Sequence, residues 1–377
     1  MEKDNKYYQS FLLNKLEISP FKERFPWIGG DLQTLRDTLV SEKLPIETAE
    51  EIKIPVKGMP VSAHSEGHLL ALLDRPKKDN KILGLVLILH GLGGSSRRNG
   101  LRRMTLELLE SGFSVLRVNL RGADPGRYLA AGTYSAKCNS DLIPVINYSR
   151  RICKSLANEN SQIKHLNKNS IPLFGVGISL GGTILLNACM DEENISSVNT
   201  SVLDGLACIS SPLDLSMCSA SIERPRNFIY QFWLLKRLVR QTLEDPFGIS
   251  QEEKNSLMSL RKENRKTISS IREFDSLITS KRWGYKDVDD YYKGASPFDA
   301  LMKKRNILPQ TLIVQSKDDP WVPSESFEKL KEEIEKIKEE NKIEFILTEK
   351  GGHNGFHGEN GCWGDLLVKR WLLSQIN

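Results

Sequence analysis

A serine between two glycines carries the clearest chemical signal in the sequence. Ser179 stands at the centre of Gly177-Ile-Ser-Leu-Gly181, directly after an apolar segment and directly before a helical one. Such a turn between a strand and a helix strains the serine backbone and exposes its Oγ atom at the carboxyl edge of a sheet. Gly177 and Gly181 let the helix and the neighbouring strand approach closely. The pattern predicts a nucleophilic serine; the alternative is a glycine-rich turn with an incidental serine.

A histidine that follows this serine in the chain is expected to be its base. A serine hydroxyl is a weak nucleophile unless a base takes its proton. Of the six histidines, only His353 and His357 follow Ser179. His353 lies in Lys350-Gly-Gly-His-Asn-Gly355, just after a predicted strand, where an imidazole can reach over the serine. His353 is therefore the predicted base, whereas His357 is interpreted as a surface histidine, with a supporting role as the alternative.

The carboxylate that orients the histidine is expected after the preceding strand. Two candidates, Asp318 and Asp319, follow the apolar segment 310–315. Asp319 is favoured because Pro323 follows it after four residues, which is usual for this loop. Asp318 is then a neighbour that caps or hydrogen-bonds the loop; a helix-starting turn is the alternative for the pair. The order serine, aspartate, histidine is the order that this type of strand-to-helix serine turn requires.

A second glycine-rich loop supplies the remaining part of the predicted chemistry. Acyl transfer passes through an oxyanion that backbone N–H groups stabilise. Leu180, directly after the serine, is one predicted donor. The other is Leu92, in His90-Gly-Leu-Gly-Gly94, where His90 is expected to support the loop. A phosphate-binding loop is the alternative, but the segment lacks both the GxxxxGK[ST] and the GxGxxG patterns.

Alternating strand and helix patterns must position these loops. The segment 83–90 is continuously apolar, as in a strand buried on both faces, and strands alternating with helices indicate a parallel sheet. Segments 52–56 and 69–73 are predicted to pair antiparallel at the sheet edge. The other predicted strands are 113–120, 171–178, 203–210, 310–315 and 343–347, and the helices are 100–111, 142–156, 180–190, 327–338 and 366–376.

The alternation of strand and helix patterns stops after Pro212, and no convincing buried strand is found from there to Asn306. Apolar residues at helical spacing, clearest over 228–243, predict that this stretch forms a helical cap of about 90 residues. The predicted organisation is an N-terminal segment 1–50, a core 51–212 and 307–377, and a cap insertion 213–306. Five cap aromatics are candidates for lining an acyl pocket: Phe228, Tyr230, Phe232, Trp233 and Trp283.

These motifs together resemble those of the α/β-hydrolases, and three further segments narrow the resemblance. They are similar to segments of the YheT-type esterases, the yeast medium-chain fatty acid ethyl ester synthases/esterases and the animal α/β-hydrolase-domain proteins 1 to 3. The resemblance runs from about Trp27 to Trp371. The segments are Gly30-Asp-Leu-Gln-Thr34, Asn119 to Gly126, and the cap motifs Ile271-Arg-Glu-Phe-Asp275, Trp283-Gly-Tyr285 and Asp290-Tyr-Tyr292.

The resemblance implies an α/β-hydrolase fold, a mostly parallel eight-stranded sheet flanked by helices, with a helical cap. It implies a serine hydrolase that cleaves short- to medium-chain acyl esters through an acyl-enzyme formed by Ser179, Asp319 and His353. A lipase, a phospholipase or an alcohol O-acyltransferase would use the same residues. A non-catalytic binding module is the alternative of a different class, but such proteins usually lose a member of the triad.

Composition excludes several other classes. Of 377 residues, 39% are hydrophobic and 27% charged, as in ordinary globular proteins. The six cysteines form no CxxC pair and are expected to be reduced, so neither a disulfide framework nor a zinc site is expected. No cofactor is expected either. Lys and Arg exceed Asp and Glu by 53 to 48, without a basic cluster interleaved with aromatics, which disfavours nucleic acid as a partner.

Membrane and targeting signals are also lacking in the sequence. No apolar run approaches the roughly 18 residues that a spanning helix needs. The charged start, Met1 to Lys6, has no apolar signal-peptide segment behind it, so a cytoplasmic location is expected. Two features depart from the relatives: the N-terminal anchor of the animal proteins is missing, and Asp124 replaces a common glycine. The expected partner is an acyl ester or lipid, with peripheral membrane contact and the oligomeric state left open.

Overall fold

An eight-stranded sheet forms the centre of the protein. The computed structural model describes residues 2–40, 42–60, 66–77, 81–159, 170–191, 202–260, 270–337 and 341–376. The strand order is β1-β2-β4-β3-β5-β6-β7-β8. Strand β2 runs antiparallel to its neighbours β1 and β4, and the six strands β3 to β8 run parallel to one another. The strands are β1 Glu50–Lys57, β2 Glu66–Asp74, β3 Gly84–Leu89, β4 Phe113–Val118, β5 Leu173–Ile178, β6 Gly205–Ile209, β7 Gln310–Ser316 and β8 Ile343–Thr348.

The sheet is covered on both faces, which explains its apolar inner strands. In β3, Leu85, Leu87 and Leu89 belong to one apolar cluster, which includes residues of α4 and α6. Val86 and Ile88 belong to a second cluster on the other face, with residues of α1, α3 and α16. The flanking helices are α1 Glu2–Lys15, α3 Asn99–Glu110, α4 Asn139–Glu159, α6 Leu180–Cys189, α15 Glu325–Glu335 and α16 Trp363–Ser374.

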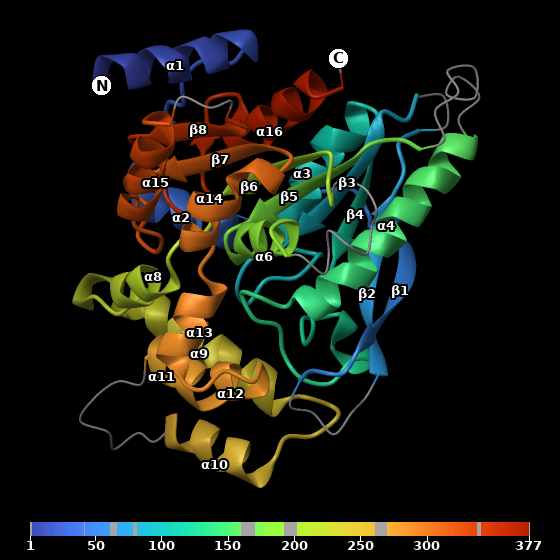
Figure 1. Ribbon diagram of the computed structural model, residues 1–377, viewed down its shortest axis with the longest axis vertical. Coiled ribbons are helices and arrows are strands. Elements are labelled where there is room, and N and C mark those ends of the chain that lie inside the picture. Colours follow the sequence, from blue (N-terminus) through green and yellow to red (C-terminus); the bar gives the residue numbers. More distant parts are fainter. Residues whose placement is uncertain are drawn as a thin grey trace.

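The described residues between β6 and β7 form helices and turns. Their own apolar cluster, with Leu234, Leu238 and Phe274, holds several of them together. Figure 1 shows α1 and α16 at one end of the molecule and α9 to α13 at the other. These elements are α8 Leu215–Ile222, α9 Phe228–Leu243, α10 Gln251–Leu260, α11 Ile271–Phe274, the π-helical turn η3 Asp275–Thr279, α12 Ser280–Arg282, α13 Val288–Ala295 and α14 Phe298–Lys304, with short 3-10 turns η2 Pro225–Asn227 and η4 Arg305–Ile307.

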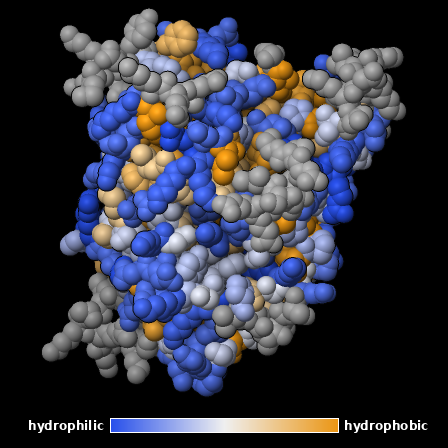
Figure 2. Space-filling view, in the orientation of Figure 1, coloured by the Kyte–Doolittle hydropathy of each residue, from blue (hydrophilic) through white to orange (hydrophobic). Residues whose placement is uncertain are grey.

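The fold class and most elements agree with the sequence predictions. The edge pair is antiparallel as expected, with Ile52 opposite Ala71, and α9 has the predicted bounds. The proposed boundaries between N-terminal segment, core and cap remain predictions. The face shown in Figure 2 is largely hydrophilic, with apolar residues in small groups. No helix of the described residues is long and apolar enough to cross a membrane.

Two N-terminal helices were not predicted. The positions of α2 (Gly30–Leu39) that are buried are Gln33 and Arg36. Polar buried positions leave no apolar periodicity, so the usual helix signal is missing there. Helix α1 is polar over most of its length; among its described side chains Leu12 and Leu13 are buried, followed by Leu16 just beyond it.

Candidate active site

Ser179 occupies the sharp turn between β5 and α6 that its flanking glycines predict. Its backbone has φ 55° and ψ −127°, a region that side-chain-bearing residues adopt only when the surroundings impose it. A Cβ atom on Gly177 would lie 2.2 Å from Gly182 Cα, and one on Gly181 would lie 2.4 Å from the Leu89 carbonyl oxygen. Only glycine fits at these two positions, because the backbone of α6 passes directly over β5 and β3.

The structure brings the three predicted triad residues into one hydrogen-bonded line. His353 Nε2 lies 2.9 Å from Ser179 Oγ, and His353 Nδ1 lies 2.8 Å from Asp319 Oδ2. The side chains of Asp319 and His353 are 0% and 3% exposed. Because Asp319 accepts through Oδ2, the Nδ1 atom carries the proton and Nε2 is left to accept the serine proton. This is the arrangement in which a histidine can act as a base toward a serine.

The loop after β7 fixes the orientation of Asp319. Its Oδ1 atom accepts hydrogen bonds from the N–H groups of Trp321 (2.8 Å) and Val322 (2.9 Å). Gln315 Nε2 donates to Oδ2 at 3.3 Å. The Trp321 ring lies over the His353 ring, with centroids 4.5 Å apart. One carboxylate oxygen is therefore held by the backbone while the other is directed at the imidazole.

Asp318 has the neighbouring role expected for it. Its Oδ1 atom accepts the N–H of Gly352 at 2.9 Å, one residue before His353. The carboxylate of Asp318 thus ties the loop after β7 to the loop after β8. Asp319 faces the imidazole ring, and Asp318 faces the backbone that carries it.

The loop after β3 approaches the serine as predicted. A Cβ atom on Gly91 would lie 2.8 Å from Ser179 Cβ, and Leu92 and Leu180 both line the pocket that contains Ser179. The Tyr134 hydroxyl accepts from Gly93 N–H (2.8 Å) and donates to the Gly91 carbonyl (3.0 Å), which fixes the loop. The N–H of Leu180 belongs to the first turn of α6, where backbone donors have no partner within the helix.

Both ring nitrogens of His90 form hydrogen bonds that hold this loop. Its Nε2 atom accepts the N–H of Leu120 at 3.2 Å, and its Nδ1 atom lies 2.9 Å from the Gly91 carbonyl oxygen, to which it donates. Burial lowers the pKa of His90 to about 4, because the charged imidazolium is disfavoured without water. A histidine that stays neutral and uses both nitrogens in hydrogen bonds is a structural residue.

A clamp from α2 on the loop of His353 was not predicted from the sequence. The N–H of His353 donates to Thr34 Oγ1 at 2.8 Å, and Thr34 Oγ1 donates to the Gly30 carbonyl at 2.6 Å. Gln33 accepts the N–H of His357 at 2.7 Å and donates to its carbonyl at 3.1 Å. The segment 30–34 was a recognisable motif, but its partners lie more than 300 residues away, which local spacing cannot reveal.

The interpretation of His357 as a surface histidine is wrong. The residue is 2% exposed, and its Nε2 atom lies 3.1 Å from Asp37 Oδ1. Asp37 also pairs with Arg103 at 2.9 Å. His357 lies in the short hairpin of β9 (His357–Gly358) and β10 (Gly361–Cys362), which α2 covers. Its glycine-flanked position suggested an exposed loop, but α2, which is distant in the sequence, packs over His357 and buries it.

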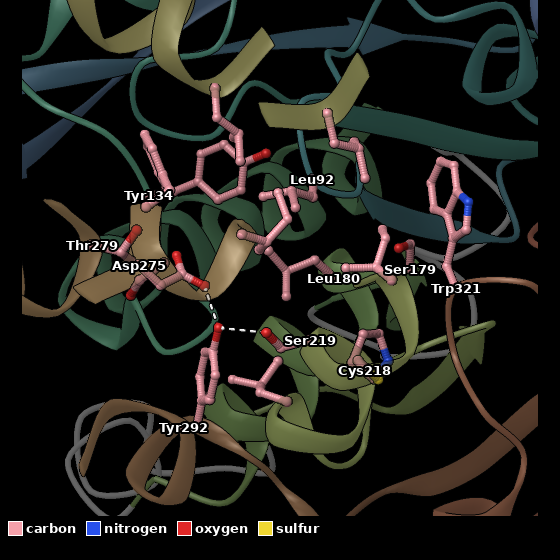
Figure 3. Close-up of a pocket in the computed structure, with 18 of the residues that line it drawn as sticks. Leu92, Tyr134, Ser179, Leu180, Cys218, Ser219, Asp275, Thr279, Tyr292 and Trp321 are labelled. Carbon is pink, nitrogen blue, oxygen red and sulfur yellow. Dashed lines mark hydrogen bonds between the residues drawn. The ribbon is translucent and has the colours of Figure 1, made fainter. Parts of the chain in front are cut away.

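The pocket above Ser179 is mostly apolar, with a cavity volume of about 120 Å³. Leu234 and Leu238 of α9 line it, together with Leu215, Ile222 and Phe274. Figure 3 shows Ser179 beside Trp321, with Leu180 and Leu92 next to the open space. Among the described residues, no group of three His, Cys, Asp or Glu side chains could hold a metal ion.

The five aromatics predicted as candidates for this pocket do not line it. Phe228, Phe232 and Trp233 are instead 44%, 54% and 42% exposed. The reason is the orientation of α9: turning Leu234 and Leu238 inward places these aromatics on the opposite face. Tyr230 packs against Trp321 with ring centroids 5.4 Å apart, and Trp283 donates to the Thr133 carbonyl.

The segment 119–126, which carries Asp124, does not line the pocket but contacts the chain beside it. Arg121 forms a two-point ion pair with Asp141 (2.6 and 2.9 Å), and both side chains are almost fully buried. Arg121 also donates to the Ala131 carbonyl at 3.1 Å, two residues before the pocket residue Thr133. Asp124 itself is exposed and pairs with Arg127 at 3.2 Å. The arginine therefore orders this side of the pocket, whereas Asp124 lies on the surface.

Comparison with known proteins places this fold in one class. The family described as alpha/beta hydrolase fold matches residues 84–359, and the chain belongs to this family. The chain is 27% identical over 346 residues to phospholipase ABHD3 of Homo sapiens, which covers 89% of this chain and 73% of that protein. It is 34% identical over 206 residues to YheT of Escherichia coli, a protein named as an esterase, which covers 54% of each.

A yeast relative and a solved structure complete the comparison. Medium-chain fatty acid ethyl ester synthase/esterase 2 of Saccharomyces cerevisiae is 27% identical over 324 residues, covering 78% of this chain and 64% of that protein. A thermophilic esterase from Thermogutta terrifontis matches with a TM-score of 0.47 and 14% identity, over 87% of this chain and 100% of that one. The resemblance inferred from the motifs is confirmed, while this chain spans between about half and three quarters of these three relatives.

Proposed function

We propose that the protein is a serine hydrolase that cleaves carboxylic esters through an acyl-enzyme. The observation that carries the proposal is the line from Ser179 Oγ through His353 to Asp319, which opens on an apolar pocket. A buried serine, histidine and aspartate with this geometry form an activated nucleophile. The names of the relatives, esterase and phospholipase, agree with ester chemistry.

The first half of the reaction forms the acyl-enzyme. Ser179 Oγ attacks the ester carbonyl carbon while His353 Nε2 accepts the hydroxyl proton. Asp319 holds the His353 ring and stabilises the imidazolium that results. The N–H groups of Leu92 and Leu180 donate to the oxyanion of the tetrahedral intermediate. The intermediate then breaks the bond to the alcohol oxygen, which leaves with the proton from His353.

The second half releases the acid. A water molecule attacks the acyl carbon while His353 takes one of its protons, and a second tetrahedral intermediate forms over the same two N–H groups. Its collapse returns the proton to Ser179 Oγ and frees the carboxylic acid. An alcohol in place of water would give a new ester, so an alcohol O-acyltransferase is the same mechanism with a different acceptor.

The apolar lining favours short- to medium-chain acyl groups as substrates. Leucine, isoleucine and phenylalanine side chains offer an acyl chain burial without hydrogen-bond partners to satisfy. We expect the purified protein to hydrolyse p-nitrophenyl esters with a maximum of kcat/KM between acetate and dodecanoate. A parallel series of phospholipids and triacylglycerols distinguishes an esterase from a phospholipase or lipase. Absence of turnover on all of these esters would contradict the proposal and favour a non-catalytic binding protein.

We propose in addition that α9 contacts anionic lipid surfaces. The helix exposes Phe228, Ile229, Phe232 and Trp233 by 42–76%. Its sequence contains three basic residues, Lys236, Arg237 and Arg240, and no acidic residue. An apolar face with adjacent lysine and arginine binds anionic bilayers. The opposite face of the same helix lines the pocket, so docking there would bring the site next to lipid.

Replacing Ile229 with glutamate is expected to weaken vesicle binding about 10-fold or more, because burial of one such side chain stabilises by about 1.5–3 kcal/mol. Co-sedimentation with phosphatidylcholine vesicles, with and without phosphatidylglycerol, measures the effect. Ile46→Glu is the matched control, since Ile46 is 90% exposed on a different segment. Equal loss in both variants, or binding that ignores phosphatidylglycerol, would argue against docking through α9.

A further inference from the structure

A polar cluster occupies the part of the pocket remote from Ser179. Asp275 and Thr279 of η3, Tyr292 of α13 and Ser219 of α8 line the same pocket as the nucleophile. Figure 3 shows them across the open space from Ser179, with Leu180 between. The reaction outlined above uses none of these groups.

Asp275 carries a half-buried carboxylate at the pocket wall. The Tyr292 hydroxyl donates to Asp275 Oδ2 at 2.9 Å, and its oxygen also lies 3.2 Å from Ser219 Oγ. Across the described ranges, no lysine, arginine or histidine forms an ion pair with Asp275. Burial raises the pKa of this carboxyl to about 6. Thr279 also hydrogen-bonds this carboxyl. A carboxylate offers about four acceptor positions, so Asp275 can accept a further donor beside Tyr292 and Thr279.

The local backbone also marks this position. Residues Asp275–Thr279 form a π-helical turn, in which Ser280 N–H donates to the Asp275 carbonyl five residues earlier. Single π turns inside helices occur often at functional sites. Here the turn brings both Asp275 and Thr279 to the pocket wall. Linking the cap helices would not by itself need a carboxylate at this place, because a neutral amide or hydroxyl could bind Tyr292.

Apolar side chains make up much of the rest of the pocket wall. Leu215, Ile222, Leu234 and Leu238 contribute to it, with Ile271 and Phe274. A chain attached at Ser179 would first pass these side chains and then reach the polar cluster. A methyl group at that end would displace water from Asp275 and offer no hydrogen bond in return. A substrate that ends in methyl is therefore expected to bind less well there than one that ends in a hydrogen-bond donor.

We propose that Asp275, Tyr292 and Thr279 form a subsite that binds a hydroxyl group carried by the ester substrate far from its reacting carbonyl. The inference rests on the proposed ester hydrolysis and names the substrate class: hydroxylated acyl or alcohol chains. A carboxylate only accepts hydrogen bonds, so the ligand must donate. A neutral hydroxyl is preferred to an ammonium group because it loses far less solvation when it passes the apolar wall.

The test compares p-nitrophenyl esters of equal chain length that end in methyl, hydroxyl or trimethylammonium. Wild-type protein is expected to favour the hydroxyl end by about 10-fold in kcat/KM at one chain length and not at shorter ones. In Asp275→Leu the methyl-terminated ester is expected to become the better substrate. Asp275→Asn, which keeps an acceptor for Tyr292, is expected to retain a reduced hydroxyl preference.

The remaining outcomes separate the inference from the proposed function. If wild-type protein favours the methyl end at every chain length, the subsite is overturned, whether or not the variants fold. If the trimethylammonium ester is best, the hydroxyl assignment is overturned in favour of a cation site. If wild-type protein hydrolyses none of the esters and takes no fluorophosphonate label, the proposed function itself fails.

Discussion

Replacing Ser179 with alanine is expected to lower kcat/KM for every ester by at least about 10⁴-fold. Removal of the nucleophile from such a triad costs this much or more, and the residual rate comes from the oxyanion donors and substrate binding. The fold should be retained, because an alanine loses only the hydroxyl that contacts His353 Nε2. Circular dichroism and the thermal midpoint, alongside an assay with a p-nitrophenyl ester, measure both effects.

A matched control and a chemical label make this experiment specific to Ser179. Ser114→Ala removes a hydroxyl that is fully buried in β4, so it reports on the general effect of a buried serine and should keep nearly full turnover. A fluorophosphonate should label wild-type protein at Ser179 and leave Ser179→Ala unlabelled. Full turnover by Ser179→Ala, or labelling of another serine, would remove Ser179 from its proposed role.

Ser179, His353 and Asp319 were predictable because the sequence patterns that mark each of them are local. Gly177 and Gly181 are required by the close contact between α6 and the strands beneath it. Asp319 and His353 each follow a strand of the parallel sheet, and the carboxyl ends of parallel strands meet at one edge. The proximity of these three residues can therefore be predicted from sequence order, glycine spacing and apolar runs alone, although no long-range contact is known beforehand.

The surroundings of the site were not predictable in the same way. Thr34 and Gln33 hold the loop of His353 through hydrogen bonds that join residues more than 300 positions apart. The helix that carries them buries polar side chains, so its sequence has no amphipathic pattern. His357 became buried for the same reason, since α2 covers a loop whose glycines suggested exposure.

The orientation of helix α9 in the cap could not be predicted from local sequence patterns either. The spacing of Phe232 and Leu235 correctly predicted that α9 is a helix, because periodicity reports the type of element. Which of its faces meets the pocket depends on the elements it packs against, here the loop after β3. Arg237 of α9 lies so close to Gly93 that a Cβ atom there would be 3.0 Å from its Cδ atom. The face with Leu234 and Leu238 lines the pocket, so Phe232 and Trp233 lie on the exposed face.

The change of Asp319 to asparagine is expected to lower kcat by about 10³- to 10⁴-fold. An asparagine at this position can keep the two backbone hydrogen bonds from Trp321 and Val322 through its oxygen. Its NH₂ group would then face His353 Nδ1, which must become the acceptor. The proton moves to Nε2, the atom that lies 2.9 Å from Ser179 Oγ, and the imidazole can no longer take the serine proton.

Asp318→Asn distinguishes this effect from a general loss of acidic charge in the loop. Asp318 binds the Gly352 N–H, a bond that an asparagine oxygen can also accept, so the expected loss is less than about 10-fold. The ratio of kcat values for the two variants, measured on one ester across pH 6 to 9, is the decisive quantity. If Asp318→Asn lost as much activity as Asp319→Asn, the loop geometry would matter more than the imidazole tautomer. The role proposed here for Asp319 would then be wrong.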